Sequence, residues 1–181
     1  MTRIRARYWA PAVALSGLLL VANVAAAQSP AASPAASPAA PAVASQLLGG
    51  GETAVAPGYE LTLRRVTMPP GTGIPPHTHP GALVLYVESG TWNYTSLSGM
   101  GRVTRATAPG ASPSPAEDLV ANVELVLTAG DVLYVAEDAR DTVSNMGDED
   151  VVVLVAGLTR VGEKFTTLTE DVPMASPSPA S

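Results

Sequence analysis

Two histidines, His77 and His79, are the residues of this chain best suited to chemistry. They are the only histidines in the 181-residue sequence, and a single residue separates them. Side chains two positions apart on an extended chain point to the same face. Both imidazoles can therefore aim at one point, and neutral imidazole is a common ligand of zinc, iron and related metals. The spacing predicts a metal or ligand site.

The segments that would position this pair have the pattern of strands rather than helices. Residues 59–68 alternate apolar Leu61 and Leu63 with polar neighbours, as a half-buried strand does. Short apolar runs separated by Gly and Asp turns are typical of a sandwich or barrel. We expect an all-β fold, with the apolar runs 83–87 and 151–155 covered on both faces and residues 106–117 forming a mobile loop. The predicted strands are 59–68, 83–87, 91–95, 123–127, 132–135, 142–145 and 151–158.

The first 27 residues have the features of an export signal. Arg3, Arg5 and Arg7 precede the apolar stretch 10–22, and small residues at 25–27 end the segment. This order predicts cleavage after Ala27 and a secreted or cell-envelope protein. The alternative is an uncleaved anchor, because about 20 apolar residues span a bilayer. Either way, the only expected membrane contact is through this segment.

The segments beyond the signal predict one folded domain between two disordered ones. Residues 28–45 are an uncharged Ala, Ser and Pro repeat without a large apolar residue before Val43, so they cannot bury enough surface to fold. Residues 173–181 are a shorter tail of the same kind. The remaining range, 46–172, is long enough for one domain with a core of its own.

The composition excludes several classes of function. Arg3, Arg5 and Arg7 are three of the 10 basic residues, so the chain after position 27 has 7 basic against 16 acidic residues. Such an acidic protein repels nucleic acid and anionic lipid. The absence of Cys excludes disulfides, thiolate metal sites and Cys nucleophiles.

Two spaced motifs in the range 61–158 resemble those of the cupin superfamily, specifically its small single-domain bacterial members. In the first motif, Gly71, His77, His79 and Gly90 match, while the usual Glu falls on Leu83. In the second motif, Gly130 and Asn145 stand at the right distance. Its Pro, Gly and His positions hold Ala136, Asp138 and Asp141. The resemblance implies a jelly-roll barrel of two antiparallel sheets with the site inside its mouth.

The resemblance also implies which residues would hold a metal. Cupin metal sites use two His, a Glu and a further His, and this chain offers His77, His79 and Asp141 at three of those positions. Two imidazoles and one carboxylate suit Fe, Mn or Zn. The alternative is that the histidines are relics, with Asp141 paired to Arg140 or capping a turn.

Three further hypotheses concern function. Trp92, Tyr94 and Tyr86 could line a ligand pocket, or they could fill the core or a dimer interface. The altered ligand set favours a module that binds a small molecule or metal without turnover. A metal-dependent oxygenase or isomerase is the alternative, and a structural, homodimerising envelope protein is a second one.

Overall fold

The structure is a computed structural model, and it describes residues 40–169. The predicted signal segment, residues 28–39 of the predicted linker and the predicted tail lie outside the described residues. The first strand begins at Ala44, and Val43 packs against the core. Within residues 40–169, no helix is long and apolar enough to span a membrane.

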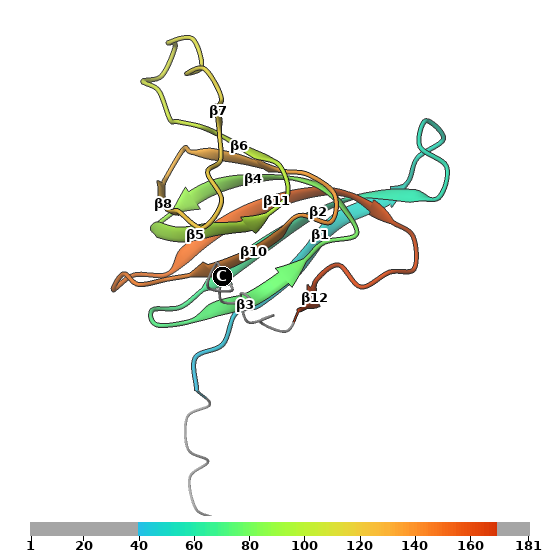
Figure 1. Ribbon diagram of the computed structural model, residues 1–181, viewed down its shortest axis with the longest axis horizontal. Coiled ribbons are helices and arrows are strands. Elements are labelled where there is room, and N and C mark those ends of the chain that lie inside the picture. The colour runs from blue at the N-terminus through green and yellow to red at the C-terminus, as the bar shows by residue number, and fades with distance from the viewer. Residues whose placement is uncertain (1–39, 170–181) are drawn as a thin grey trace, which may run out of the picture. The chain divides into compact units, whose positions relative to one another are not determined.

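Within residues 40–169, twelve strands form two antiparallel sheets (Figure 1). The seven-stranded sheet contains, in spatial order, β1 (Ala44–Glu52), β2 (Tyr59–Met68), β11 (Val151–Arg160), β4 (Gly81–Ser89), β9 (Val132–Val135), β6 (Gly101–Thr104) and β7 (Glu117–Asp118). The five-stranded sheet contains β12 (Thr167–Leu168), β3 (Gly73–Thr78), β10 (Arg140–Ser144), β5 (Thr91–Ser98) and β8 (Glu124–Thr128). The expected all-β class with two antiparallel sheets is confirmed.

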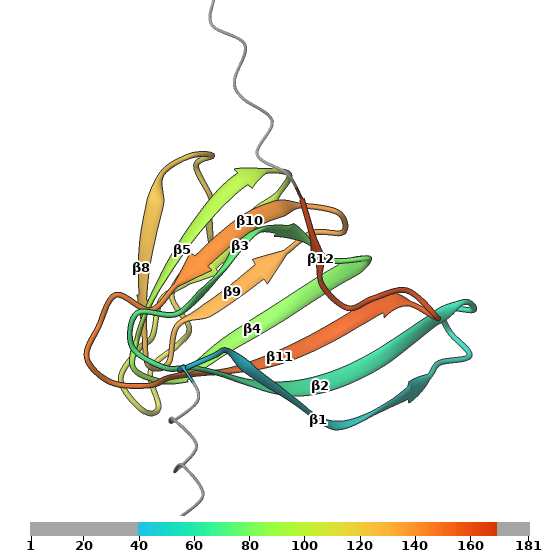
Figure 2. The same ribbon diagram turned by 90° about the horizontal axis from the view of Figure 1, so that it is seen from below.

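The sheets lie face to face, and their inward side chains form the core (Figure 2). In β4, for example, Leu83, Leu85 and Val87 are buried while the residues between them are not. The expected closure into a barrel is not found, because no ladder in residues 40–169 joins one sheet to the other. At the open edge, β1 and β12 each pair with only one strand.

The motif glycines make the turns that set the strand registers. Gly90 joins β4 to β5 with a φ of 82°, which L-residues rarely adopt. A Cβ there would also lie 2.7 Å from the carbonyl oxygen of Asp150. Gly130, with a φ of 92°, makes the equivalent turn between β8 and β9.

Two expectations about burial are wrong. Val84 and Tyr86 of β4 are 47% and 43% exposed, so the run 83–87 is covered on one face only. In β11, buried residues alternate with half-buried ones, so Val152 and Leu154 are not covered on the outer face either. An apolar run can mark a strand whose outer side chains are apolar and still reach the surface.

Candidate functional site

Adjacent strands of the five-stranded sheet bring the three predicted site residues together. His77 in β3 and Asp141 in β10 are direct cross-strand partners in the β3–β10 ladder. His79 follows β3 and lies on the same side as His77, and the ring centroids are 4.9 Å apart. All three side chains are buried. The alternating geometry of a strand and the ladder register together explain this convergence.

The donor atoms are grouped, although they are spread more widely than they would be around a bound metal. Each residue offers one ligand atom, and these atoms lie within 4.8 Å of one another. His77 Nε2 is 3.2 Å from Asp141 Oδ1. Two ligands at about 2.1 Å from a tetrahedral metal stand about 3.4 Å apart, so metal binding requires the most widely spaced donor atoms to approach by roughly 1 Å or more. In residues 40–169, this is the one group of three His, Asp or Glu residues with such geometry.

Backbone carbonyls hold both imidazoles by their Nδ1 atoms. His77 Nδ1 lies 2.9 Å from the Pro75 carbonyl oxygen, and His79 Nδ1 lies 2.6 Å from that of Phe165. A carbonyl only accepts, so each Nδ1 carries the proton and donates. Each Nε2 is then the unprotonated nitrogen that can bind a metal, and the tethers fix the ring orientations.

Burial shifts the pKa values of the three groups in the directions that favour the neutral form of each. Desolvation lowers the pKa of His77, and it lowers the pKa of His79 to about 4 despite the hydrogen bond to Phe165. Desolvation also raises the pKa of Asp141 to about 7, against the opposing effect of a hydrogen bond from Tyr94. Without a metal, a proton on Asp141 can bridge Oδ1 and the His77 Nε2 acceptor.

Tyr94 supports the carboxyl group from the other side, and the sequence did not single it out for this role. Its hydroxyl donates to Asp141 Oδ2 at 3.3 Å. Burial, followed by the Asp141 charge, raises the pKa of Tyr94, so the phenol stays protonated and remains a donor. Asp141 and Tyr94 stand on neighbouring strands, β10 and β5. This contact is inside the sandwich, so Asp141 does not cap a surface turn, as one alternative interpretation had it.

The three residues line a cavity of about 80 Å³ between the sheets. Leu83 belongs to its wall and is 1% exposed, so the position of the usual Glu brings an apolar group rather than a donor oxygen. Most of the wall is apolar. The other lining residues are Val43, Ser45, Val66, Met68, Ile74, Leu85, Trp92, Tyr94, Val135, Val143, Val153, Val155, Phe165 and Thr166.

The three aromatic residues that the sequence analysis grouped do not lie together, because two point into the sandwich and one points outward. Trp92 and Tyr94 line the cavity, are each 2% exposed and pack edge to face. They therefore serve both the core and the cavity wall. Tyr86 points outward from β4, so its expected place beside them is wrong. Tyr86 is two residues after Val84 on β4, so both side chains point to the outer face of the seven-stranded sheet.

Phe165 is a site residue that the sequence did not reveal. It is the only Phe in the chain, and it lies in the segment before β12. Its ring packs against His79 with centroids 5.2 Å apart, while its carbonyl accepts from the His79 ring. A backbone acceptor leaves no signal in residue type, and position 165 lies 86 residues from its partner.

Arg64, Arg65, Arg102 and Arg105 have separate partners and surroundings. Arg65 pairs with Glu88, Arg102 with Asp118, and Arg105 with Asp131. Burial raises the pKa of Asp131, but hydrogen bonds from Ala106, Thr128 and Arg105 outweigh it and lower that pKa overall. Arg64 faces inward, opposite to Arg65, because the two are consecutive on β2.

Comparisons with known proteins give structural likenesses only. No family model matches the chain, and no curated protein matches it significantly. The solved structures similar to it include a cupin 2 domain-containing protein from Halorhodospira halophila, with 15% identity over 72% of each chain and a TM-score of 0.47. A cupin superfamily protein from Desulfitobacterium hafniense has 13% identity over 65% of this chain and 77% of its own, with a TM-score of 0.44.

An oxalate decarboxylase from Lactobacillus farciminis, solved as a formate complex, is also similar, at 20% identity and a TM-score of 0.38. The match covers 56% of this chain and only 25% of that enzyme. With TM-scores below 0.5, these likenesses say nothing about activity. The Desulfitobacterium and Halorhodospira proteins are both described as cupins, the superfamily whose two motifs this sequence resembles.

Proposed function

We propose that this cupin-like protein binds one divalent metal ion through His77, His79 and Asp141. The observation that carries the proposal is the convergence of two tethered imidazoles and one carboxyl group on a buried cavity. Two neutral Nε2 atoms and one carboxylate oxygen suit Fe(II), Mn(II) or Zn(II). A metal held by three protein ligands would supply Lewis acidity and open positions for water or a ligand.

The chain's own residues would prepare this site in three ways. The carbonyls of Pro75 and Phe165 keep each Nε2 free. Tyr94 orients the Asp141 carboxyl group through Oδ2 and leaves Oδ1 toward His77. The apolar wall, including Leu83, excludes water and strengthens every polar interaction inside. The small ligand that we expect beside the metal would enter this same cavity.

Two properties outside the described residues complete the proposal. The Arg-rich start and apolar stretch of residues 1–27 support export, and the Ala, Ser and Pro repeat supports a spacer between the envelope and the domain. The binding domain would then act in the cell envelope or outside the cell. N-terminal sequencing of the protein purified from its own host would test the cleavage after Ala27.

A metal titration tests the proposal directly. The full-length protein is stripped with a chelator and titrated with Zn(II), Mn(II) and, without oxygen, Fe(II). We expect one metal per chain and a rise in Tm, since a ligand that binds only the folded state stabilises it. His79→Ala and Asp141→Asn should lose the effect, whereas Asp118→Asn, which alters an exposed ion pair, should keep it. Melting curves that no metal shifts in the wild type would rule out the metal centre.

A further inference from the structure

Two inward-facing residues of β2, Thr62 and Arg64, carry buried polar atoms without a hydrogen-bond partner. These atoms are Thr62 Oγ1 and Arg64 Nε. We call the two residues the rim pair. Buried polar groups in proteins are almost always satisfied, and an unsatisfied one is costly, above all on a charged group. Two such atoms two residues apart on one strand face indicate that an acceptor belongs between them.

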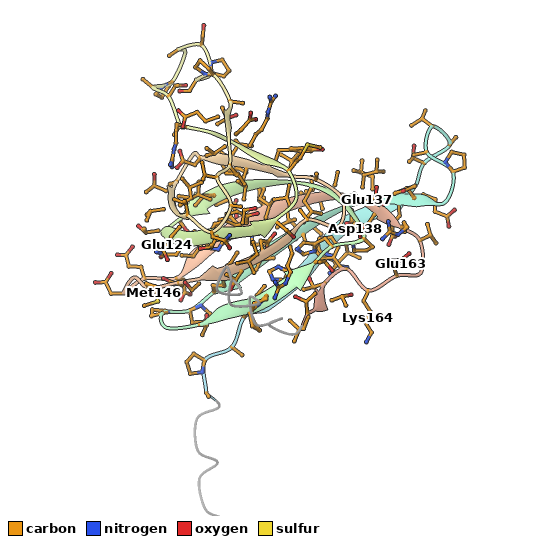
Figure 3. All side chains as sticks on the ribbon, viewed as in Figure 1. Glu124, Glu137, Asp138, Met146, Glu163 and Lys164 are labelled. Carbon is orange, nitrogen blue, oxygen red and sulfur yellow. The ribbon has the colours of Figure 1, made fainter. Side chains whose placement is uncertain are left out.

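The charge of Arg64 also has no carboxylate partner among residues 40–169. Its contact is with an aromatic ring, since Cζ lies 4.6 Å from the centroid of Phe165. The neighbouring charges are already matched. Arg160 pairs with Glu137, Asp138 and Glu163, and Figure 3 shows these three acidic residues together near the segment that leads to β12. Lys164 points away from them into solvent (Figure 3).

The rim pair lies next to the cavity of the proposed metal site. Val66, two residues after Arg64 on the same strand face, lines the cavity, and so does Val155, the cross-strand partner of Arg64. Phe165 lies between Arg64 and His79, with its ring in contact with both. The open edge between β1 and β12 leaves this side of the sandwich unpaired (Figure 2). An acceptor bound to Thr62 and Arg64 would therefore stand at the cavity entrance.

The size and polarity of the cavity limit what such a ligand can be. A volume of about 80 Å³ is room for roughly five water molecules, or a ligand of a few non-hydrogen atoms. Half of the lining residues are Val, Leu and Ile, and Met, Trp and Phe add to the apolar surface, which favours an apolar body. A carboxylate matches the planar fork of a guanidinium and can also accept from a hydroxyl.

We propose that Thr62 and Arg64 bind the carboxylate of a short monocarboxylic acid whose apolar part occupies the cavity. The inference rests on the proposed function, because the same cavity holds the metal site, and it adds the chemical class of the ligand. A dianion such as phosphate fits less well, since one guanidinium would face two charges inside an acidic protein.

Calorimetric titration of the full-length protein, with and without Zn(II), tests the inference. The probes are butyrate and its neutral isostere butyramide. The wild type should bind butyrate at least tenfold more tightly. Arg64→Gln should abolish this preference, and Thr62→Val should reduce it severalfold. Arg65→Gln is the matched control, because the adjacent Arg65 points to the other face and pairs with Glu88, and it should bind as the wild type does.

Several results would overturn the inference. They are equal affinity for the two probes, no binding of butyrate, a preference that survives in Arg64→Gln, and tighter Arg64-dependent binding of inorganic phosphate. If Arg64→Gln does not fold, Arg64→Lys is used instead. It keeps the charge without the planar guanidinium and should still weaken the binding of butyrate. Zn(II) titration separates the two proposals. One Zn(II) per chain without a carboxylate preference overturns only this inference, whereas an Arg64-dependent preference without Zn(II) binding supports it and counts against the metal centre.

Discussion

Leu83 is the residue that most limits the proposed metal centre. It lines the cavity with His77, His79 and Asp141 and contributes no donor atom. We expect Leu83→Glu to add a fourth ligand and to raise Zn(II) affinity at least tenfold, while the stripped protein loses about 1–3 kcal/mol because an unpaired carboxyl group is buried. Competition with a zinc chelator dye gives the affinity.

Val84→Glu is the matched control for that change, because Val84 is adjacent on β4 and points outward. It should leave Zn(II) affinity unchanged. The double variant Leu83→Glu with Asp141→His restores the motif ligands completely and should bind more tightly than the wild type. A double variant that binds no better than its parent would show that positions 83 and 141 are not the motif positions.

The pKa values of the site predict how metal affinity depends on pH. Asp141 has its pKa raised to about 7, so its protonated form is favoured in the folded protein and must lose a proton to bind metal. The pKa of His79 is lowered to about 4, so this ring is neutral throughout the range above pH 5. We expect Zn(II) affinity to fall about tenfold per pH unit below pH 7, with one proton competing. A hundredfold fall in Zn(II) affinity per pH unit, which two competing protons would produce, would contradict these assignments.

The same shifts predict opposite effects on the stability of the metal-free protein. The contribution of Asp141 is present below its ordinary pKa of 3.8 and is lost as pH rises through about 7. The contribution of His79 is present above 6.5 and is lost as pH falls through about 4. Asp141→Asn imitates the protonated acid, so it should be modestly more stable than the wild type at pH 5 and more stable by a larger margin at pH 8. Urea unfolding at both pH values measures the difference.

The sequence predicted which three residues meet, but it did not predict what holds them. His77 and His79 follow from strand alternation, which is a local feature, and Asp141 follows from the resemblance to the second cupin motif. The Phe165 carbonyl, the Tyr94 hydroxyl and the inward Arg64 depend on contacts between distant strands. Such partners are set by the tertiary register, which residue type alone does not encode.

At the scale of the elements, Asn145 connects the two turns that flank β3 and β11. It is completely buried, and its side-chain amide donates to the carbonyl oxygens of Met68 and Glu149. Its side-chain oxygen accepts from the Gly147 backbone N–H. Asn145, the last residue of the second motif, thus has a structural role that does not depend on metal binding.

Replacement of Asn145 should therefore destabilise the fold without altering the donor atoms of the site. We expect Asn145→Ala to lower the free energy of unfolding by about 2–4 kcal/mol, because the Met68 carbonyl in a buried hydrogen bond, and the Glu149 carbonyl and Gly147 N–H in partly buried ones, lose their partner. Asn93→Ala is the control, since Asn93 donates only one exposed hydrogen bond, to Glu124, and should cost less than about 1 kcal/mol. Equal losses for the two variants, measured by urea unfolding, would contradict the role of Asn145.

The strands were predictable because apolar alternation and turn glycines are strong local signals. The sequence placed β2 at its observed bounds, 59–68. The predicted strands did not include β1, β3 or the short strands β6, β7 and β12. The sequences of β1 and β3 contain three glycines and two prolines respectively, residues that are rare in strands. Both are held by partner strands rather than by propensity. The apolar runs of β4 and β11 predicted strands correctly, yet periodicity could not tell whether a second layer covers their outer face.

At the scale of the whole molecule, the exposed apolar outer face of the seven-stranded sheet still needs an explanation. Leu63, Ala156, Val84 and Tyr134 form one cross-strand row over four strands of the seven-stranded sheet. Large apolar side chains around this row are at least 36% exposed: Leu61, Leu63, Val84, Tyr86, Tyr134 and Leu158. Contiguous apolar patches of this kind are uncommon on monomers and mark contact surfaces.

We expect this face to pair with the same face of a second copy, which agrees with the homodimer considered from the sequence. A two-fold axis through the Val84 row would bury each patch against its equal and leave the Arg65–Glu88 ion pair of each copy near the rim. Val84→Lys places a charge at the centre of the contact and should convert the expected dimer into a monomer in sedimentation velocity. Val126→Lys is the matched control, because Val126 is equally exposed, at 47%, but lies on the five-stranded sheet. A wild-type protein that sediments as a monomer at 100 µM, or a dimer that both variants leave intact, would show that the face stays open to solvent.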